Sequence, residues 1–521
     1  MSHLLIAPLL LPLLTAVLLI FLSGRSLLLI RSLSVISAAL LVAIAVALLQ
    51  IANDGQIHLY ALGNWIPPFG IVLVLDRLSA LMLLVTSVLA LFSLVYASRG
   101  TDGPGDKLHA MVQFLLLGVN GAFLTGDLFN LFVFFEVLLI ASYALLLHGR
   151  GAERARAGLH YVVINLAGSA LFLIAVSALY GITGSLNMAD MAANIAQLDP
   201  ADAPLAATAG VLLLVVFGLK AAIAPLYFWL PRAYASASAP VAALFAIMTK
   251  VGVYTIVRTY TLIFGDSAGP LANLALPWLW PLALITLALG LLGALAAREL
   301  RVQIAYLVVV SVGTLLAGIA LNTEAALAAS FYYLIHSTWI CGALFLLANL
   351  IQRQRGDLGD RITKGPRMAQ SALLGSLFFI AAVSVIGLPP LSGFIGKLLL
   401  LSAAGTQGNA IWLWVLLLAG SLATLMALSR SGSTFFWRGE GDVVSTRGST
   451  SPVANSLDAG KPLAQKGELL AVIGLLLSIF MVTLGASTVL DYTQALAHQL
   501  LSPEAYIQAM HEFTAIEGNS Q

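Results

Sequence analysis

Apolar runs of about twenty residues recur along the whole chain and are separated by short polar segments. A helix of about that length crosses the hydrocarbon core of a bilayer, because each residue adds about 1.5 Å and the core is about 30 Å thick. The pattern therefore predicts an all-α polytopic membrane protein with about fourteen transmembrane helices. The predicted spans are 4–22, 30–50, 72–97, 108–125, 128–148, 158–181, 205–231, 237–264, 272–296, 301–321, 325–351, 371–403, 409–430 and 468–491.

Composition agrees with a membrane protein and leaves no room for a soluble domain. Of 521 residues, 60% are hydrophobic and 9% are charged. The longest polar interval, 431–467, is rich in Gly, Ser and Thr and is predicted to be a flexible loop. The first run, 4–22, has no basic segment before it and no cleavage site after it, so we expect a retained helix.

The sequence contains no motif that indicates a cofactor or a nucleic-acid partner. The single cysteine, Cys341, lies inside an apolar run, which excludes a disulfide framework and a thiolate-held cluster within the chain. No nucleotide-binding loop of the GxxxxGKS type occurs. A net charge of +2 gives no indication of nucleic-acid binding. We therefore expect no cofactor and no nucleic-acid partner, with the lipid bilayer as the surroundings.

The charges between the spans alternate in sign along the chain. The loops 51–71, 126–127, 182–204, 265–271 and 322–324 hold acidic residues and no Lys or Arg. Because short cytoplasmic loops collect Lys and Arg, both termini are predicted on the non-cytoplasmic side. The basic residues in or beside the alternate loops are Arg25, Arg31, Arg99, Lys107, Arg150, Arg154, Arg156, Arg232, Arg298, Arg301, Arg353, Arg355, Arg361, Lys364, Arg367, Arg430, Arg438, Arg447, Lys461 and Lys466.

Five of the 25 basic residues lie neither in the alternate loops nor beside them. Arg77 and Arg258 are about six residues from the outer ends of their helices, where a long side chain can snorkel to the interface. Lys220, Lys250 and Lys397 remain in the membrane interior. These three lysines need a chemical explanation.

One acidic residue and one histidine share this depth with the lysines. Glu136 and His336 each lie near the middle of a span. A charge at the bilayer centre costs roughly 2.5–3.5 kcal/mol on insertion scales, so such residues usually have a role. An ion pair that locks helices together would explain Glu136 and one lysine. A proton relay would explain all five, because buried lysines readily lose their charge and histidine titrates near neutral pH.

Prolines lie close to two of the lysines. Pro225, in VFGLKAAIAPLYFWLP, cannot donate to the carbonyl of Ala221, so the helix is predicted to break just after Lys220. Pro389 and Pro390 free two more carbonyls in the span that contains the third lysine. Two Pro-interrupted helices, each with a lysine, are typical of a repeated half-unit in a transporter.

Further polar side chains crowd around these residues, and each is either a helix-packing contact or part of a hydrated path. Asp127 either admits cations or protons at the outer mouth of the Glu136 helix or caps the start of that helix. The remaining polar candidates are Asn165, Ser169, Ser236, Ser238, Thr249, Tyr254, Ser311, Thr314, Tyr332, Tyr333, Ser337 and Thr338.

Three motifs, in order, carry a resemblance to a known family. They are NLFVFFEVLLIASY, GLKAAIAPLYFWLPRAYASASAPVAALFAIMTKVGVY and GLPPLSGFIGKLLLL. The region 76–430 resembles the proton-translocating antiporter-like subunits shared by respiratory complex I and the Mrp-type cation/proton antiporters. Within that family the chain is most similar to the Mrp (Mnh, Pha) D-type subunits.

The resemblance implies two inverted five-helix repeats, the first in 108–264 and the second in 272–430, each with one Pro-broken helix. Outside these repeats we expect helices 1–3 in residues 1–107, the loop 431–467, helix 14 in 468–491 and an acidic tail in 492–521; the loop and the tail fall outside the resemblance. The tail could form amphipathic turns against a partner or be disordered.

The resemblance also implies a role for the five interior residues. Glu136 would pair with Lys220, and protons would pass through Lys250 and His336 to Lys397. The chain would act in a bacterial inner membrane beside A-, B-, C-, E-, F- and G-type subunits and exchange H⁺ for Na⁺ or K⁺ as part of a transporter, not an enzyme. The alternative is a proton-pumping subunit of a complex I-like NADH:quinone oxidoreductase or membrane hydrogenase. A standalone solute carrier and a non-transporting scaffold remain rivals of another class.

Overall fold

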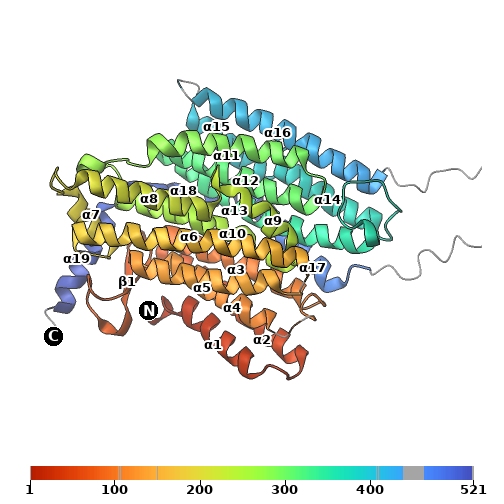
Figure 1. The fold of residues 1–521 in the computed structure, drawn as a ribbon, viewed down its shortest axis with the longest axis horizontal. Coiled ribbons are helices and arrows are strands. Elements are labelled where there is room, and N and C mark those ends of the chain that lie inside the picture. Colours follow the sequence, from red (N-terminus) through yellow and green to blue (C-terminus); the bar gives the residue numbers. More distant parts are fainter. Residues whose placement is uncertain are drawn as a thin grey trace, which may run out of the picture.

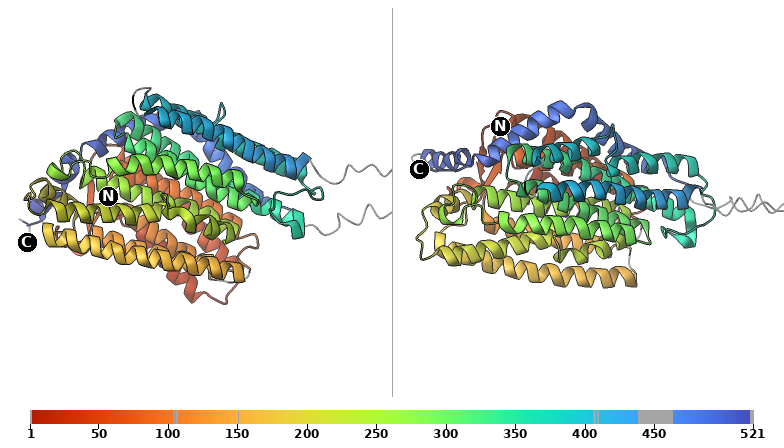
Figure 2. Two further views of the ribbon diagram at one scale, coloured as in Figure 1. Left: turned by 45° about the horizontal axis from the view of Figure 1, so that its top comes forward. Right: turned by 90° about the horizontal axis from the view of Figure 1, so that it is seen from above.

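The computed structural model describes residues 2–103, 105, 107–149, 151–405, 408, 410–437 and 463–518. Residues 438–462, most of the predicted flexible loop 431–467, lie outside the described residues. The chain forms a bundle in which most helices run along the long axis (Figure 1), and the turned views agree (Figure 2).

The fold is almost entirely helical. The α-helices are α1 Ala7–Phe21, α2 Leu27–Ala52, α3 Arg77–Ala97, α4 Leu108–Leu124, α5 Leu128–Leu147, α6 Ala152–Thr183, α7 Met188–Ala196, α8 Ala203–Ala221, α9 Trp229–Ser236, α10 Ala239–Leu262, α11 Leu276–Ala296, α12 Leu300–Ala320, α13 Glu324–Arg355, α14 Ser371–Ile386, α15 Ser392–Ala404, α16 Ala410–Gly432, α17 Lys466–Leu484, α18 Ala486–Leu501 and α19 Glu504–Gly518. Short helical turns are η1 Ser2–Leu4, η2 Leu62–Asn64, η3 Leu226–Phe228, η4 Gly269–Leu271, η5 Gly356–Leu358 and η6 Ser433–Trp437, and the strands are β1 His58–Ala61 and β2 Val72–Leu75.

The described helices account for the predicted spans. Eleven helical segments are long and apolar enough to cross a membrane. The shorter apolar helices α1 and α4 match two further spans, and α14 and α15 are two halves of another. The all-α polytopic class is therefore confirmed.

Two predicted boundaries are wrong. The segment 72–97 begins as strand β2, which pairs antiparallel with β1, before α3 starts at Arg77. Asp76 sets that start, because its side chain accepts from the Ser79 backbone N–H at 2.8 Å while Ser79 Oγ accepts from the Asp76 N–H. The helix predicted at 158–181 is longer and begins at Ala152.

Both predicted helix breaks are present. Helix α8 ends at Ala221, and Ala222 adopts the left-handed conformation with φ of 64° before α9 begins at Trp229. Helix α14 ends at Ile386, Gly387 has φ of 81°, and α15 begins five residues later. In each case the chain turns in the middle of a span.

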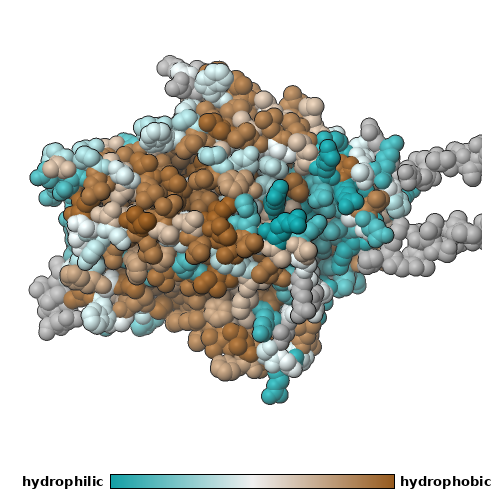
Figure 3. Space-filling model, viewed as in Figure 1, coloured by the Kyte–Doolittle hydropathy of each residue, from teal (hydrophilic) through white to brown (hydrophobic). Residues whose placement is uncertain are grey.

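The loops gather by charge at the two ends of the bundle. At one end, which we call the basic end, His148 bonds to the Thr101 carbonyl, Arg154 to the Ser236 carbonyl, and Arg301 to the Ala235 carbonyl. At the other, the acidic end, an isolated β-bridge joins Asp127 to Asn187. The start of α1 and helix α19 lie toward the acidic end (Figure 1), and α19 packs against α7. Figure 3 shows an apolar middle and a strongly hydrophilic basic end.

The C-terminal tail is helical and packs on the chain itself. Helix α18 contacts α13 and α3, and α19 contacts α7. Leu496, Leu500, Tyr506 and Met510 are all buried. The segment 492–521, as far as it is described, is therefore helical and packed on the chain, and the expectation that it is disordered is wrong.

The expectation that Arg258 snorkels to the interface is wrong. Its guanidinium is buried and forms an ion pair with Asp76 at 2.7 Å, and the rings of Tyr254 and Tyr506 lie 5.5 and 5.4 Å from it. The acid that α3 uses as its cap thus also neutralises this arginine. Arg77, which starts α3, donates to the Asn53 carbonyl at the acidic end.

Replacing Asp76 with Asn should destabilise the protein by about 3–5 kcal/mol, because it leaves a buried arginine without a counter-charge. Thermal unfolding in detergent, followed by circular dichroism, measures the change. The exposed Asp54→Asn provides the matched control, since Asp54 pairs only with His58 at the surface. Equal unfolding temperatures for the two variants would contradict this account of the ion pair.

Candidate functional site

The five predicted relay residues come from five different helices. Glu136 lies on α5, Lys220 on α8, Lys250 on α10, His336 on α13 and Lys397 on α15. The central two, Lys250 and His336, are 0% and 1% exposed, and Lys220 is 5% exposed. Glu136 and Lys397 are half-buried. The set therefore has a fully enclosed centre and two partly open ends.

Glu136 and Lys220 each contact a polar side chain of α6. Glu136 Oε1 accepts a hydrogen bond from Ser169, and Lys220 Nζ donates to Asn165 Oδ1 at 3.3 Å. Lys220 also lies 5.6 Å from the centre of the Phe135 ring. Glu136 interacts electrostatically with Lys220, but among the described residues no direct ion pair joins them.

The first helix break places Lys220 in the last turn of α8. Trp229 Nε1 donates to the Leu219 carbonyl at 3.2 Å, and the Ala224 N–H donates to Thr286 Oγ1 of α11 at 2.8 Å. Two backbone groups at the break thus have partners within the protein. A helix C-terminus favours a cation, so the break also suits an ammonium group.

Lys250 is held by a serine on α12. Lys250 Nζ donates to Ser311 Oγ at 2.9 Å, and the Ser311 hydroxyl donates to the Val308 carbonyl. One turn further along α12, the Thr314 hydroxyl donates to the Val310 carbonyl at 2.9 Å. Lys250 is therefore held by a neutral hydroxyl group.

His336 is held by a serine at the start of α15. Nδ1 lies 2.9 Å from Ser392 Oγ. Either atom can be the donor, because the neutral imidazole has two tautomers. A neutral imidazole can take up a proton at the ring nitrogen that lacks a hydrogen.

Lys397 occupies the second helix break. Its Nζ donates to the Val385 and Ile386 carbonyls, at 3.3 and 2.8 Å, and to Ser421 Oγ of α16 at 3.1 Å. Pro389 and Pro390 stand four residues after these carbonyls and have no N–H to offer them. The lysine therefore replaces the two hydrogen bonds that the prolines remove.

Sequence reasoning missed three residues that complete the site: Thr286, Ser392 and Ser421. Ser392 is part of the motif GLPPLSGFIGKLLLL, but nothing in the sequence places it beside His336. Several expected polar residues instead bond backbone carbonyls as ordinary packing contacts: Ser236, Thr249, Tyr254, Tyr332, Ser337 and Thr338.

Asp127 caps a helix. Its carboxylate accepts from the Asn130 N–H at 2.6 Å at the start of α5, which confirms the capping interpretation. Burial raises the pKa of Asp127 to about 6. Its role as an entry point remains a prediction.

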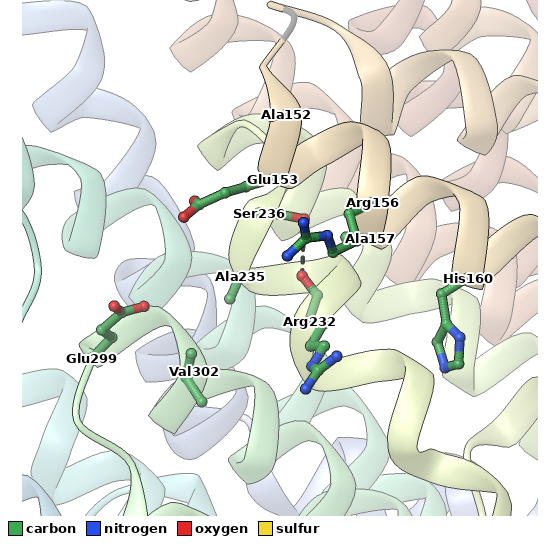
Figure 4. Close-up of a pocket in the computed structure, with 10 residues that line it drawn as sticks. All are labelled: Ala152, Glu153, Arg156, Ala157, His160, Arg232, Ala235, Ser236, Glu299 and Val302. Atoms are coloured by element: carbon green, nitrogen blue, oxygen red, sulfur yellow. Dashed lines mark hydrogen bonds between the residues drawn. The ribbon is translucent and has the colours of Figure 1, made fainter.

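A hollow of about 530 Å³ opens at the basic end, between the start of α6, helix α9 and the start of α12. Figure 4 shows Glu153 and Glu299 on one side of it, and Arg156, Arg232 and His160 on the other. Burial and the nearby Asp360 raise the pKa of Glu299. Within the described ranges, no three His, Cys, Asp or Glu side chains come together as a metal site.

Comparisons with known proteins show the family of the chain. Residues 125–426 match the family described as NADH:quinone oxidoreductase/Mrp antiporter, TM, and the chain belongs to this family of membrane proteins. Within it the chain is similar over almost its whole length to the D-type components of antiporters. It is 41% identical to the D-type component of a probable K⁺/H⁺ antiporter of Rhizobium meliloti, over 96% of each chain. It is 39% identical to the D-type component of the Na⁺/H⁺ antiporter of Bacillus subtilis, over 98% of this chain and 99% of the relative.

Solved structures show the same fold. A chain of the Mrp complex from Dietzia superimposes with a TM-score of 0.84 at 30% identity, covering 98% of this chain and all of that one. A chain of respiratory complex I from Thermus thermophilus gives 0.76 at 23% identity, covering 95% of this chain and 99% of that one.

Gly393 is where α15 approaches both α13 and α14, and Gly393→Ala should disturb the site. An added Cβ would lie 2.1 Å from the Ser384 carbonyl oxygen and 2.7 Å from His336 Nε2. We expect a loss of about 1–3 kcal/mol in stability from overpacking. Gly181→Ala, on α6 with open space around it, is the control and should be neutral. If thermal unfolding in detergent were the same for both, α15 would not be tightly fixed here.

Proposed function

We propose that this chain is the proton-translocating D-type subunit of a multisubunit monovalent cation/proton antiporter. The observation that carries the proposal is the set of five titratable side chains at mid-depth, each provided with hydrogen-bond partners. Its relatives are named as components of K⁺/H⁺ and Na⁺/H⁺ antiporters. Neighbouring A-, B-, C-, E-, F- and G-type subunits and exchange of Na⁺ or K⁺ for H⁺ are part of this proposal.

In this proposal Glu136 and Lys220 form a switchable pair. While Glu136 is charged and near, the Lys220 ammonium is stabilised. When Glu136 is neutralised, desolvation of the ammonium is uncompensated and its proton moves toward Lys250. His336 then accepts and releases the proton, and Lys397 stores it before release.

The two breaks belong to corresponding halves of the chain. We assign 108–264 and 272–430 as inverted five-helix repeats, with 1–107 and helix 468–491 outside them. The lysine near each break supports this division. We further propose that the basic end is cytoplasmic, so both termini face the other side, and that the hollow in Figure 4 gives water access to α9.

Lys220→Ala and Glu136→Gln should each reduce cation-driven proton exchange at least tenfold, because either change removes one partner of the switch. The measurement is Na⁺- or K⁺-triggered pH change in inverted vesicles that contain the chain with its neighbouring subunits, under a respiration-imposed gradient. Lys364→Ala is the control, since Lys364 is exposed at the basic end.

Exchange at the wild-type rate in both variants, in a correctly assembled complex, would sink the proposal and favour a scaffold. No cation response in the wild type, together with pumping coupled to quinone reduction, would instead assign the chain to the redox-driven branch of the family.

Sidedness has a separate test by cysteine labelling. Ala152→Cys, at the basic end, should be inaccessible to a membrane-impermeant maleimide in intact cells, and Ala201→Cys, at the acidic end, should be labelled. Both positions are exposed. The native Cys341 is buried, so we expect little background labelling from it. The reverse labelling pattern would invert the proposed orientation.

A further inference from the structure

Helix α6 places two neutral polar residues between the acid and the base of the proposed switch. Asn165 and Ser169 are four residues apart on α6, so they lie one helical turn, about 6 Å, from each other on one face. Asn165 contacts Lys220 of α8, and Ser169 contacts Glu136 of α5. Both α6 residues are at most 5% exposed. The charged partners are therefore separated by a side-chain bridge.

The donors and acceptors available on Asn165 and Ser169 determine the direction of each hydrogen bond. Asn165 Nδ2 donates to the Tyr161 carbonyl at 2.9 Å, which can only accept. The amide oxygen must therefore face Lys220, where it accepts from the ammonium. Ser169 has a single hydrogen, which it donates to Glu136, so its oxygen retains free lone pairs.

We propose that the Ser169 hydroxyl carries the proton between Lys220 and Glu136, and that Asn165 is a positioning residue that holds the lysine in the resting state. This inference rests on the proposed function. The four-carbon stem of Lys220 allows its Nζ atom to move by one turn of α6, from Asn165 to Ser169.

The transfer restores the pair after Lys220 has given its proton toward Lys250, when Glu136 is a neutral acid and Lys220 a neutral amine. The Glu136 O–H bond breaks as its hydrogen bonds to Ser169 Oγ. The original Ser169 O–H bond breaks, and that hydrogen goes to Lys220 Nζ. Glu136 becomes a carboxylate, Lys220 an ammonium, and Ser169 keeps one hydrogen. Two opposite charges form together, so the net charge in the membrane does not change.

Ser169→Ala should lower cation-driven proton exchange at least tenfold, because alanine has no hydroxyl. Ser169→Thr keeps the hydroxyl and should retain exchange within about threefold of wild type. The ratio of the exchange rates in H₂O and D₂O adds a measurement that a change in packing alone would not alter. This solvent isotope effect should be kept in Ser169→Thr and reduced in the residual activity of Ser169→Ala. The control Ser177→Ala changes an exposed serine on the same helix.

Asn165→Leu preserves approximate shape but removes the acceptor for the ammonium. Exchange should continue with its pH optimum moved to lower pH, because the charged lysine is less stabilised. An unchanged pH profile would exclude the positioning role of Asn165.

The outcomes separate this inference from the proposed function. Full exchange in Ser169→Ala while Lys220→Ala is inactive would overturn the hydroxyl transfer and leave the antiporter function intact. Full exchange in both would remove the proposed function itself. Equal losses in Ser169→Ala and Ser169→Thr, with assembly intact, would also overturn the proposal.

Discussion

An ammonium group buried between membrane helices has no bulk water to solvate it, so the protein must supply an acceptor at the same depth. The three interior lysines meet this requirement with neutral oxygens: the amide of Asn165, the hydroxyl of Ser311, and two backbone carbonyls with the hydroxyl of Ser421. The buried arginine near the acidic end, Arg258, has a carboxylate instead. At the basic end, Arg31 and His109 both bond Asp102.

This difference in partners separates the charges held in ion pairs from the charges held by neutral acceptors. A buried guanidinium and carboxylate in direct contact resist separation, because removing either leaves the other uncompensated. Burial alone would raise the pKa of Asp102, but hydrogen bonds from Arg31 and His109 outweigh it and hold the pKa well below its usual range. Neutral acceptors bind an ammonium less strongly than a carboxylate does. In the proposed relay, this difference leaves the interior lysines stabilised enough to be buried and free enough to exchange protons.

Much of this could be predicted from the sequence, because apolar length, loop charge and proline each act locally. Glu136, the three lysines and His336 stood out because a charged or titratable residue in an apolar run is rare. Lys220 and Lys397 stood out further because of the adjacent prolines. The sequence could not show that Arg258 meets Asp76 of α3 or that Ser392 meets His336, since those contacts join segments far apart in the chain. The strand Val72–Leu75 was read as helix because its run of apolar residues has no period to distinguish the two.

The position of Lys397 at the second break has a consequence for how a charge can leave the membrane interior. Its partners are the end of a helix and a hydroxyl, and none of them carries a formal negative charge. When a lysine paired with a carboxylate gives up its proton, an unpaired anion stays behind and opposes the loss. Deprotonation of Lys397 leaves only dipoles, which small movements of the backbone and nearby water can accommodate. In the proposed relay, the prolines thus provide a place where a proton is held and released without its departure creating a new buried charge.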